Sequence, residues 1–175
     1  DGIFKNSTSF NQSLTNWDTS NVTTMSEMFK NATAFNQNIS NWDVSKVTQM
    51  HYMFQNASAF NADLSQWNTS SAQNMIYMFQ NATSFNQNIG DWDVSSTAPS
   101  TGGLEGMFSG ASSYSYSVKK WCVSNFSSAP ADFSTGSQLN NSKLPVWGVC
   151  PSRATLIITT SDADNVIYSG SDLSI

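Results

Sequence analysis

A repeat with a period of 25 residues is the feature that most constrains how this chain folds. Its most visible mark is a tryptophan at Trp17, Trp42, Trp67 and Trp92. Repetition at a fixed period in the twenties indicates stacked units. A unit of this size cannot bury its apolar side alone, so neighbouring units must cover one another.

Apolar side chains recur at fixed positions of this unit, and we expect them to form its core. Their columns are Phe4, Phe29, Phe54, Phe79 and Phe108; Phe10, Phe35, Phe60, Phe85 and Tyr114; Leu14, Ile39, Leu64, Ile89 and Val118; Met25, Met50 and Met75; and Met28, Met53, Met78 and Met107. Methionine fills gaps where aromatic rings stack irregularly, so the Met and Trp columns are interpreted as core rather than as a ligand pocket.

The unit contains two different spacings. Met25, Met28 and Phe29 lie on one face of a predicted helix, with Ser20 and Asp18 near its N-cap. The helix is predicted to end in a left-handed residue, at the column Asn31, Asn56, Asn81 and Gly110. Residues 35–42 are predicted to be a short extended segment. The sequence therefore predicts an α/β repeat with one short strand and one short helix per turn of about 25 residues.

The units are predicted to form five turns over residues 1–126, then a degenerate C-terminal capping turn over 127–150, and a β-rich extension or the start of a following domain over 151–175. The chain begins inside a repeat, so we expect it to be a fragment with an open N-terminal end. Cys122 and Cys150 fall on adjacent turns near the end of the repetitive part. A disulfide between them would staple the cap, and two buried free thiols are the alternative.

The pattern Phe-Asn-x-x-Ile/Leu-x-x-Trp-Asp-x-Ser-x-Val-x-x-Met-x-x-Met-Phe resembles the roughly 26-residue repeat of bacterial surface proteins and mycoplasma-type lipoproteins, which is similar to BspA-type leucine-rich repeats. The resemblance is strong from residue 4 to about residue 126 and weak up to residue 150. It implies a leucine-rich-repeat-like right-handed solenoid in a secreted or cell-surface protein. It also implies adhesion or partner binding, with no enzymatic role.

Charge and residue content argue against several classes of function. The net charge is −5 and only 11% of residues are charged, with no cluster of Lys or Arg, so nucleic acid is not an expected partner. No apolar run reaches the length of a membrane span, so we expect no membrane insertion within this segment. His51 is the single histidine, and no nucleophile–base pair or metal ligand set accompanies it. We expect no catalysis, cofactor or metal.

Two polar columns have structural interpretations. One is Asp18, Asp43, Asn68 and Asp93, and the other is Asn11, Asn36, Asn61 and Asn86. One carboxylate per turn supplies too few oxygens for a good calcium site, so helix capping is the better account of the first column. The second column is predicted to be an internal ladder that bonds backbone groups of neighbouring turns.

Two outward surfaces remain as candidate partner-binding sites. The helix is predicted to expose an apolar and aromatic patch of His51, Tyr52, Ile76 and Tyr77. The extended segment is predicted to present an amide-rich stripe that includes Gln37, Asn38, Asp63, Gln87 and Asn88. Amides on a rigid face suit sugar hydroxyls or an extended peptide. Plain solvated surface is the alternative for both.

Asn-x-Ser/Thr sequons are frequent, and in a eukaryotic secretory protein several would accept glycans. The candidates are Asn6, Asn31, Asn56, Asn81 and Asn125. The repeat itself generates three of them, so their number alone is weak evidence for glycosylation.

The sequence thus predicts a non-catalytic extracellular or cell-surface module for adhesion, with a protein or a carbohydrate as its partner. One alternative is a structural segment of a fibre or coat that assembles with copies of itself. A second alternative is ice binding, for which the column Thr19, Val44, Thr69 and Val94 falls short of a continuous threonine array.

Overall fold

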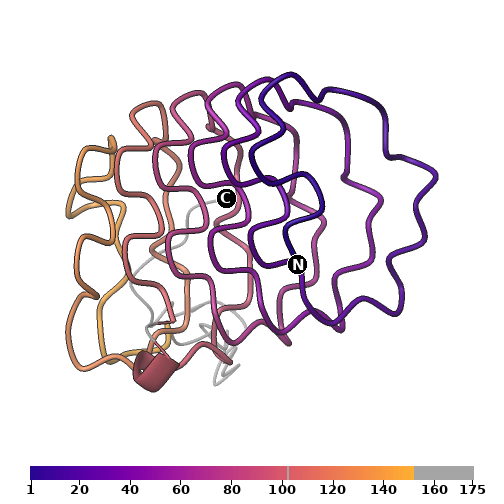
Figure 1. Cartoon of the computed structure of the whole chain (residues 1–175). Coiled ribbons are helices and arrows are strands. Elements are labelled where there is room, and N and C mark those ends of the chain that lie inside the picture. The colour runs from indigo at the N-terminus through magenta and orange to yellow at the C-terminus, as the bar shows by residue number, and fades with distance from the viewer. Residues whose placement is uncertain (102, 152–175) are drawn as a thin grey trace, which may run out of the picture.

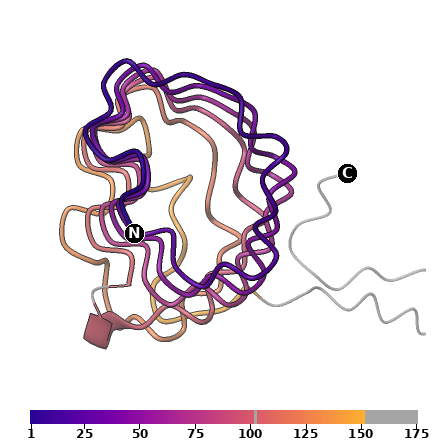
Figure 2. The same cartoon turned by 45° about the vertical axis from the view of Figure 1, so that its right-hand side comes forward.

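A computed structural model describes residues 1–101 and 103–151 of the chain. Over these residues the backbone winds into successive coils that stack along one axis, which the colours of Figure 1 follow from indigo to orange. Each coil holds one copy of the repeat, and Figure 2 shows the first coils lying nearly in register behind one another. The extension predicted from residue 151 onward lies, apart from Pro151, outside the described residues.

The prediction of an α/β, leucine-rich-repeat-like solenoid with a strand and a helix in every turn is wrong. Within residues 1–101 and 103–151 the only helix is the 3-10 helix η1 (Pro99–Thr101), which lies in the loop that lengthens one coil, and no strand forms. Strand-like pairing in this part of the chain is limited to two isolated parallel bridges, from Gln49 to Thr24 and to Asn74. The repeats stack without regular secondary structure.

Hydrogen bonding between coils explains why the predicted helix does not form. The N–H groups of Met25 and Phe29 donate to the carbonyls of Gln49 and Met53 in the following coil, at 2.8 and 2.9 Å. The N–H of Met28 instead closes a tight turn on the carbonyl of Met25, at 3.2 Å. A helix would require these groups to bond four residues back in their own segment. So short a helix is marginal, and pairing with the neighbouring coil replaces it.

The extended segments are joined by side chains rather than by a strand ladder. The N–H of Asn36 donates to Oδ1 of Asn11 at 2.9 Å, and the N–H of Asn61 donates to Oδ1 of Asn36 at 2.8 Å. The same bond joins the N–H of Ser115 to Oδ1 of Asn86 at 3.0 Å. The predicted internal asparagine ladder is therefore confirmed. Its side-chain oxygens take the place that strand carbonyls would have in a sheet.

Each coil reverses direction at two residues with positive φ. The two columns are Gly2, Glu27, Tyr52, Tyr77, Gly106 and Asp132, and Asn6, Asn31, Asn56, Asn81, Gly110 and Gly136. The left-handed conformation predicted for the asparagine column is confirmed, with φ of 61° at Asn31 and 59° at Asn56. Its interpretation as a helix C-cap is wrong because no helix precedes it. Asparagine tolerates this conformation better than most residues.

Aromatic rings stack both within coils and between them. The ring centroid of Phe54 lies 3.9 Å from that of Phe60 in the same coil, and 5.6 Å from those of Phe29 and Phe79 in the adjacent coils. These rings and the Met columns are buried. The columns predicted from the repeat thus form one continuous core along the stack, and burial of this apolar surface is the main term that stabilises it.

The tryptophan column contributes a hydrogen bond as well as apolar surface. Nε1 of Trp42 donates to the carbonyl of Leu14 at 3.2 Å, and Nε1 of Trp67 donates to the carbonyl of Ile39 at 3.1 Å. The same bond recurs in the next two coils. Each one satisfies a buried indole N–H and ties a coil to the one before it.

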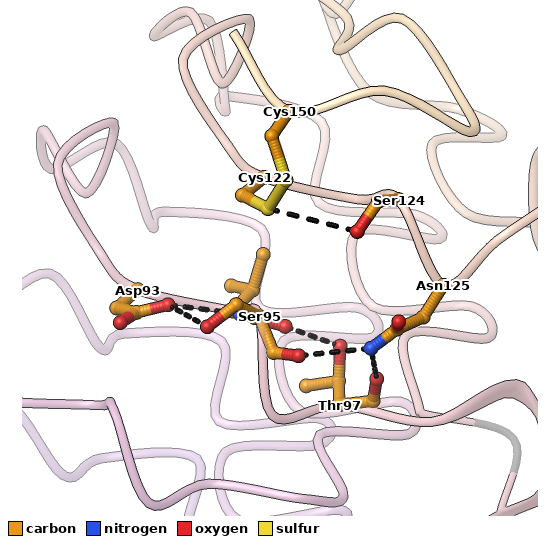
Figure 3. The surroundings of a disulfide bond; sticks show 8 residues. Asp93, Ser95, Thr97, Cys122, Ser124, Asn125 and Cys150 are labelled. Atoms are coloured by element: carbon orange, nitrogen blue, oxygen red, sulfur yellow. Dashed lines mark hydrogen bonds between the residues drawn. A yellow bond between two sulfur atoms is a disulfide. The ribbon is translucent and has the colours of Figure 1, made fainter. Parts of the chain in front are cut away.

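The regular stacking changes at the C-terminal end of the described chain. Phe133 meets Phe108 edge-on, with ring centroids 5.5 Å apart and planes at 90°, and Trp147 meets Phe133 at 83°. Cys122 and Cys150 are joined as a disulfide across 28 residues (Figure 3), which is compatible with the predicted staple of the cap. The predicted division of the chain at residues 126 and 150 stays a prediction.

Candidate recognition surfaces

The predicted aromatic patch comes together, but it lies on the coils rather than on a helix, and its residues are half-buried. The rings of Tyr52 and Tyr77 stack with centroids 5.5 Å apart and planes at 13°. Nζ of Lys30 lies 4.4 Å from the centroid of the Tyr52 ring. The Tyr77 ring also lies so close to Gly106 that a Cβ at that residue would clash with it. The ring faces are therefore largely covered, and the row packs on itself.

Hydrogen bonds and charges hold this row in place. The hydroxyl of Tyr77 donates to Oε1 of Glu105 at 2.7 Å, which raises the pKa of Tyr77 to about 12. The carboxylate of Glu27 forms ion pairs with Nζ of Lys5 at 2.5 Å and with Nζ of Lys30 at 3.1 Å. These bonds hold the pKa of the Glu27 carboxyl below its usual range. Exposed pairs of this kind contribute little stability, so their main effect is to orient the side chains.

His51 has a local partner within the same row. Its Nδ1 lies 3.1 Å from Oγ of Ser26 in the preceding coil, and its ring meets the edge of Tyr52. Burial lowers the pKa of His51 below its usual value, so the ring is neutral at pH 7. These contacts make His51 part of the packing between coils rather than an outward-facing group.

The glutamines of the predicted amide stripe bond mainly to the asparagine ladder. Nε2 of Gln37 donates to Oδ1 of Asn11 at 2.9 Å, and Nε2 of Gln87 donates to Oδ1 of Asn61 at 3.0 Å. Both side chains are half-buried. Their Nε2 donors bond to the asparagine ladder, so these two glutamines are less available to a partner than the sequence indicated.

The other members of the stripe are exposed and held by tight turns. Oδ1 of Asn38, Asp63 and Asn88 accepts the N–H two residues further on, at 2.9, 2.8 and 3.1 Å. Each is an Asx turn, in which the side chain bonds its own backbone. Nδ2 of Asn38 and of Asn88 has no hydrogen-bond partner within the described chain. The stripe therefore presents two oriented amide donors, on Asn38 and Asn88, that lie two coils apart.

The Asp18, Asp43, Asn68 and Asp93 column forms Asx turns, so the helix-capping interpretation is wrong. Oδ1 of Asp18 accepts the hydroxyl of Ser20 at 2.7 Å and its N–H at 3.0 Å. These bonds hold the pKa of Asp18 below its usual value. No group of three His, Cys, Asp or Glu side chains suited to a metal ion occurs within residues 1–101 and 103–151.

The sequons of the repeat point their side-chain amides into a second ladder. Nδ2 of Asn31 donates to Oδ1 of Asn6 at 2.6 Å, Nδ2 of Asn56 to Asn31 at 2.7 Å, and Nδ2 of Asn81 to Asn56 at 2.9 Å. Nδ2 of Asn125 is engaged too, because it donates to two backbone carbonyls at the start of the lengthened loop (Figure 3). A glycan on Nδ2 would compete with these bonds, and glycosylation of any of the five stays a prediction.

The column that suggested ice binding faces the core. Thr19, Val44, Thr69 and Val94 are all buried. Oγ1 of Thr69 donates to the carbonyl of Asp93 at 2.9 Å, in the following coil. A buried column presents no face to ice, so it gives no support to that alternative.

A hollow that the sequence did not single out lies where the amide stripe reaches the fifth coil. It has a volume of about 190 Å³ and is lined in part by Asn88, Asp91, Tyr116 and Lys120. Tyr116 is 44% exposed. The sequence carried a signal for it, since Tyr116 stands in the column that holds Gln37 and Gln87 in earlier units.

Together these features define a repeat protein of stacked coils, held by a core of aromatic rings and by ladders of side-chain amides. Residues 1–102 and residues 59–147 each match the family described as Mycoplasma protein of unknown function, DUF285. The chain belongs to this family. Neither a curated protein nor a solved structure matches it. Within the described part of the chain, no helix has the length and apolar character needed to cross a bilayer.

Proposed function

We propose that this chain is a non-catalytic recognition module of an extracellular or cell-surface protein, and that it binds a protein or a carbohydrate through the stripe of Asn38, Asp63 and Asn88. The observation that carries the proposal is the orientation of these groups. Each side chain is held by an Asx turn on a stacked frame, while polar atoms of the stripe remain available to solvent. A partner that bonds to them need not order them first, which reduces the entropy cost of binding.

The resemblance of the repeat to those of bacterial surface proteins and to BspA-type repeats supports a surface location and an adhesive role. The residue content supports binding rather than catalysis. The sequence has one histidine, and the two cysteines are bonded to each other. The disulfide also suits an oxidising, extracellular setting.

A glycan and peptide array tests the proposal. Binding to an array component should fall when Gln37→Ala and Asn38→Ala are combined, because this double change removes one oriented donor and one brace of the stripe. The matched change at the aromatic row, Tyr52→Ala with Tyr77→Ala, should leave binding in place, since those rings are covered by their neighbours. Absence of binding to every array component would count against recognition as the function.

A further inference from the structure

We infer that the hollow on the fifth coil is a binding subsite for a single neutral pyranose ring, with Tyr116 as the surface on which the sugar stacks. The inference rests on the proposed recognition function and names its ligand class. It starts from a local departure from the repeat. Tyr116 replaces a glutamine of the stripe, and Lys119 and Lys120 replace the small and polar residues that precede the tryptophan in earlier coils.

Gly90 lets the backbone of the fifth coil come close to the fourth beside the hollow. Earlier coils have Ser40 and Ser65 at this position. A Cβ on Gly90 would lie 2.6 Å from the carbonyl oxygen of Ser117 and 3.2 Å from Oδ1 of Asn88. The backbone of the fifth coil therefore approaches closely, and the 190 Å³ space opens outside this contact. It is smaller than the roughly 300–1,000 Å³ of sites for drug-sized ligands, which suits one sugar ring rather than a longer ligand.

The ring of Tyr116 is uncovered, unlike the rings of the half-buried Tyr52 and Tyr77. Tyr52 and Tyr77 stack on each other, with centroids 5.5 Å apart. Within residues 1–101 and 103–151, Tyr116 has neither a stacked aromatic neighbour nor a hydrogen bond from its hydroxyl. An open aromatic face is an apolar surface with a fixed direction, and a tyrosine adds a polar tip. A pyranose offers the complementary shape, because its ring C–H groups form a small apolar face while its hydroxyls point outward.

The polar groups around the ring supply both donors and acceptors. Nδ2 of Asn88 is free to donate, because only its Oδ1 is used, by the N–H of Gly90 at 3.1 Å. Nζ of Lys120 pairs with Oδ1 of Asp91 at 3.0 Å, with both side chains more than two-thirds exposed. These two charges offset each other, and the one further charge in the lining, on Lys119, is exposed to solvent and screened by salt. The hollow therefore selects only weakly for an anion. Mixed donors and acceptors match the hydroxyls of a neutral sugar.

The repeat itself provides the test variant. Tyr116→Gln installs the residue that Gln37 and Gln87 show to be compatible with this column, so folding should be retained. The probes are the methyl glycosides of glucose, galactose, mannose and N-acetylglucosamine. Their binding is measured by ¹H–¹⁵N NMR titration. We expect at least one to bind with millimolar affinity and to shift the amide signals around Tyr116. In Tyr116→Gln that affinity should fall about tenfold or more, a loss of about 1.4 kcal/mol.

The matched control is Tyr52→Gln, the same change of residue type on the aromatic row, and it should bind the glycoside normally. If Tyr116→Gln binds as tightly as the parent, or if no glycoside shifts signals near residue 116, the inference is overturned. The proposed function survives that result when the array still finds a partner whose binding depends on Asn38. A failure of both experiments removes both ideas.

Discussion

Substitutions at Asn56 separate two contributions to the stability of a coil. The residue has a φ of 59°, and its side chain donates to Asn31 at 2.7 Å and accepts from Asn81 at 2.9 Å. Asn56→Ala removes both bonds, at about 0.5–1.5 kcal/mol each. It also places alanine in a left-handed conformation, which costs roughly 1 kcal/mol more than asparagine or glycine would. We expect a total loss of about 2–4 kcal/mol in the free energy of unfolding.

Asn56→Gly removes the same bonds without the conformational strain, so it should be more stable than the alanine variant by about 1 kcal/mol. The fifth coil already carries Gly110 in this column. Urea unfolding followed by tryptophan fluorescence measures the three proteins. Equal stability of the alanine and glycine variants would refute the role assigned to backbone conformation, and equal stability of parent and glycine variant would refute the role of the ladder.

A control pair at Ser84 should show the opposite order. This side chain is exposed, has no hydrogen bond among the described residues, and is absent from the positive-φ columns. Ser84→Ala should change stability by less than about 0.5 kcal/mol. Ser84→Gly should be less stable than Ser84→Ala, because glycine adds freedom to the unfolded chain. The reversal between the two sites distinguishes a left-handed requirement from a general effect of glycine.

Three further outcomes are expected. Trp67→Phe should lower the free energy of unfolding in urea by about 1–3 kcal/mol, because it leaves a buried carbonyl of the preceding coil without its indole donor. An unchanged urea midpoint would show that this hydrogen bond does not stabilise the fold. Reduction of the Cys122–Cys150 bond should cost about 3–4 kcal/mol, seen as a lower Tm in dithiothreitol that a double serine variant no longer shows; equal sensitivity of both proteins would contradict it. The pKa of Asp18 is lowered in the folded state, so its contribution is present above the unfolded pKa of about 3.9 and is lost as pH falls through the folded value. NMR titration should give a value below about 3.9, and Asp18→Asn should weaken the acid dependence of stability.

The core could be predicted because it depends on which residues repeat, and burial follows the apolar columns whatever the local conformation. Phe54 and Trp67 are buried as their columns require. The ladder through Asn36 and the left-handed Asn56 also followed from residue type. A polar group next to the core needs a partner, and asparagine accepts positive φ with little strain.

Local conformation could not be predicted, because the spacing of Met25, Met28 and Phe29 fits a helix and a coil of tight turns equally well. The two conformations differ in the acceptors of the backbone N–H groups, and in this fold those acceptors lie about one repeat unit away in the sequence. The second positive-φ column shows the same limit. Glu27 and Tyr52 are not residues that signal a left-handed conformation, and only glycines elsewhere in the column, such as Gly106, pointed to it.

The sequence predicted which residues of the candidate surfaces lie next to one another. It did not predict how much of each side chain is exposed to solvent. Tyr52 and Tyr77 do lie together, yet contact between coils covers their faces. Gln37 lies on the predicted stripe, yet its amide bonds to the ladder. Tyr116 could not be predicted from the repeat, because it departs from the column that holds Gln37 and Gln87 in earlier coils.

Because every ladder joins a coil only to its nearest neighbours, the number of coils is a free variable of this architecture. Removal or duplication of one whole unit, such as residues 30–54, would leave each junction built from the same pairs of groups. Loss of half a unit would break the pairs at the junctions next to the deletion. Phenylalanine rings in adjacent coils such as Phe29 and Phe54 lie 5.6 Å apart. The number of coils therefore sets, in steps of one coil, the distance between the hollow at Tyr116 and the first described coil.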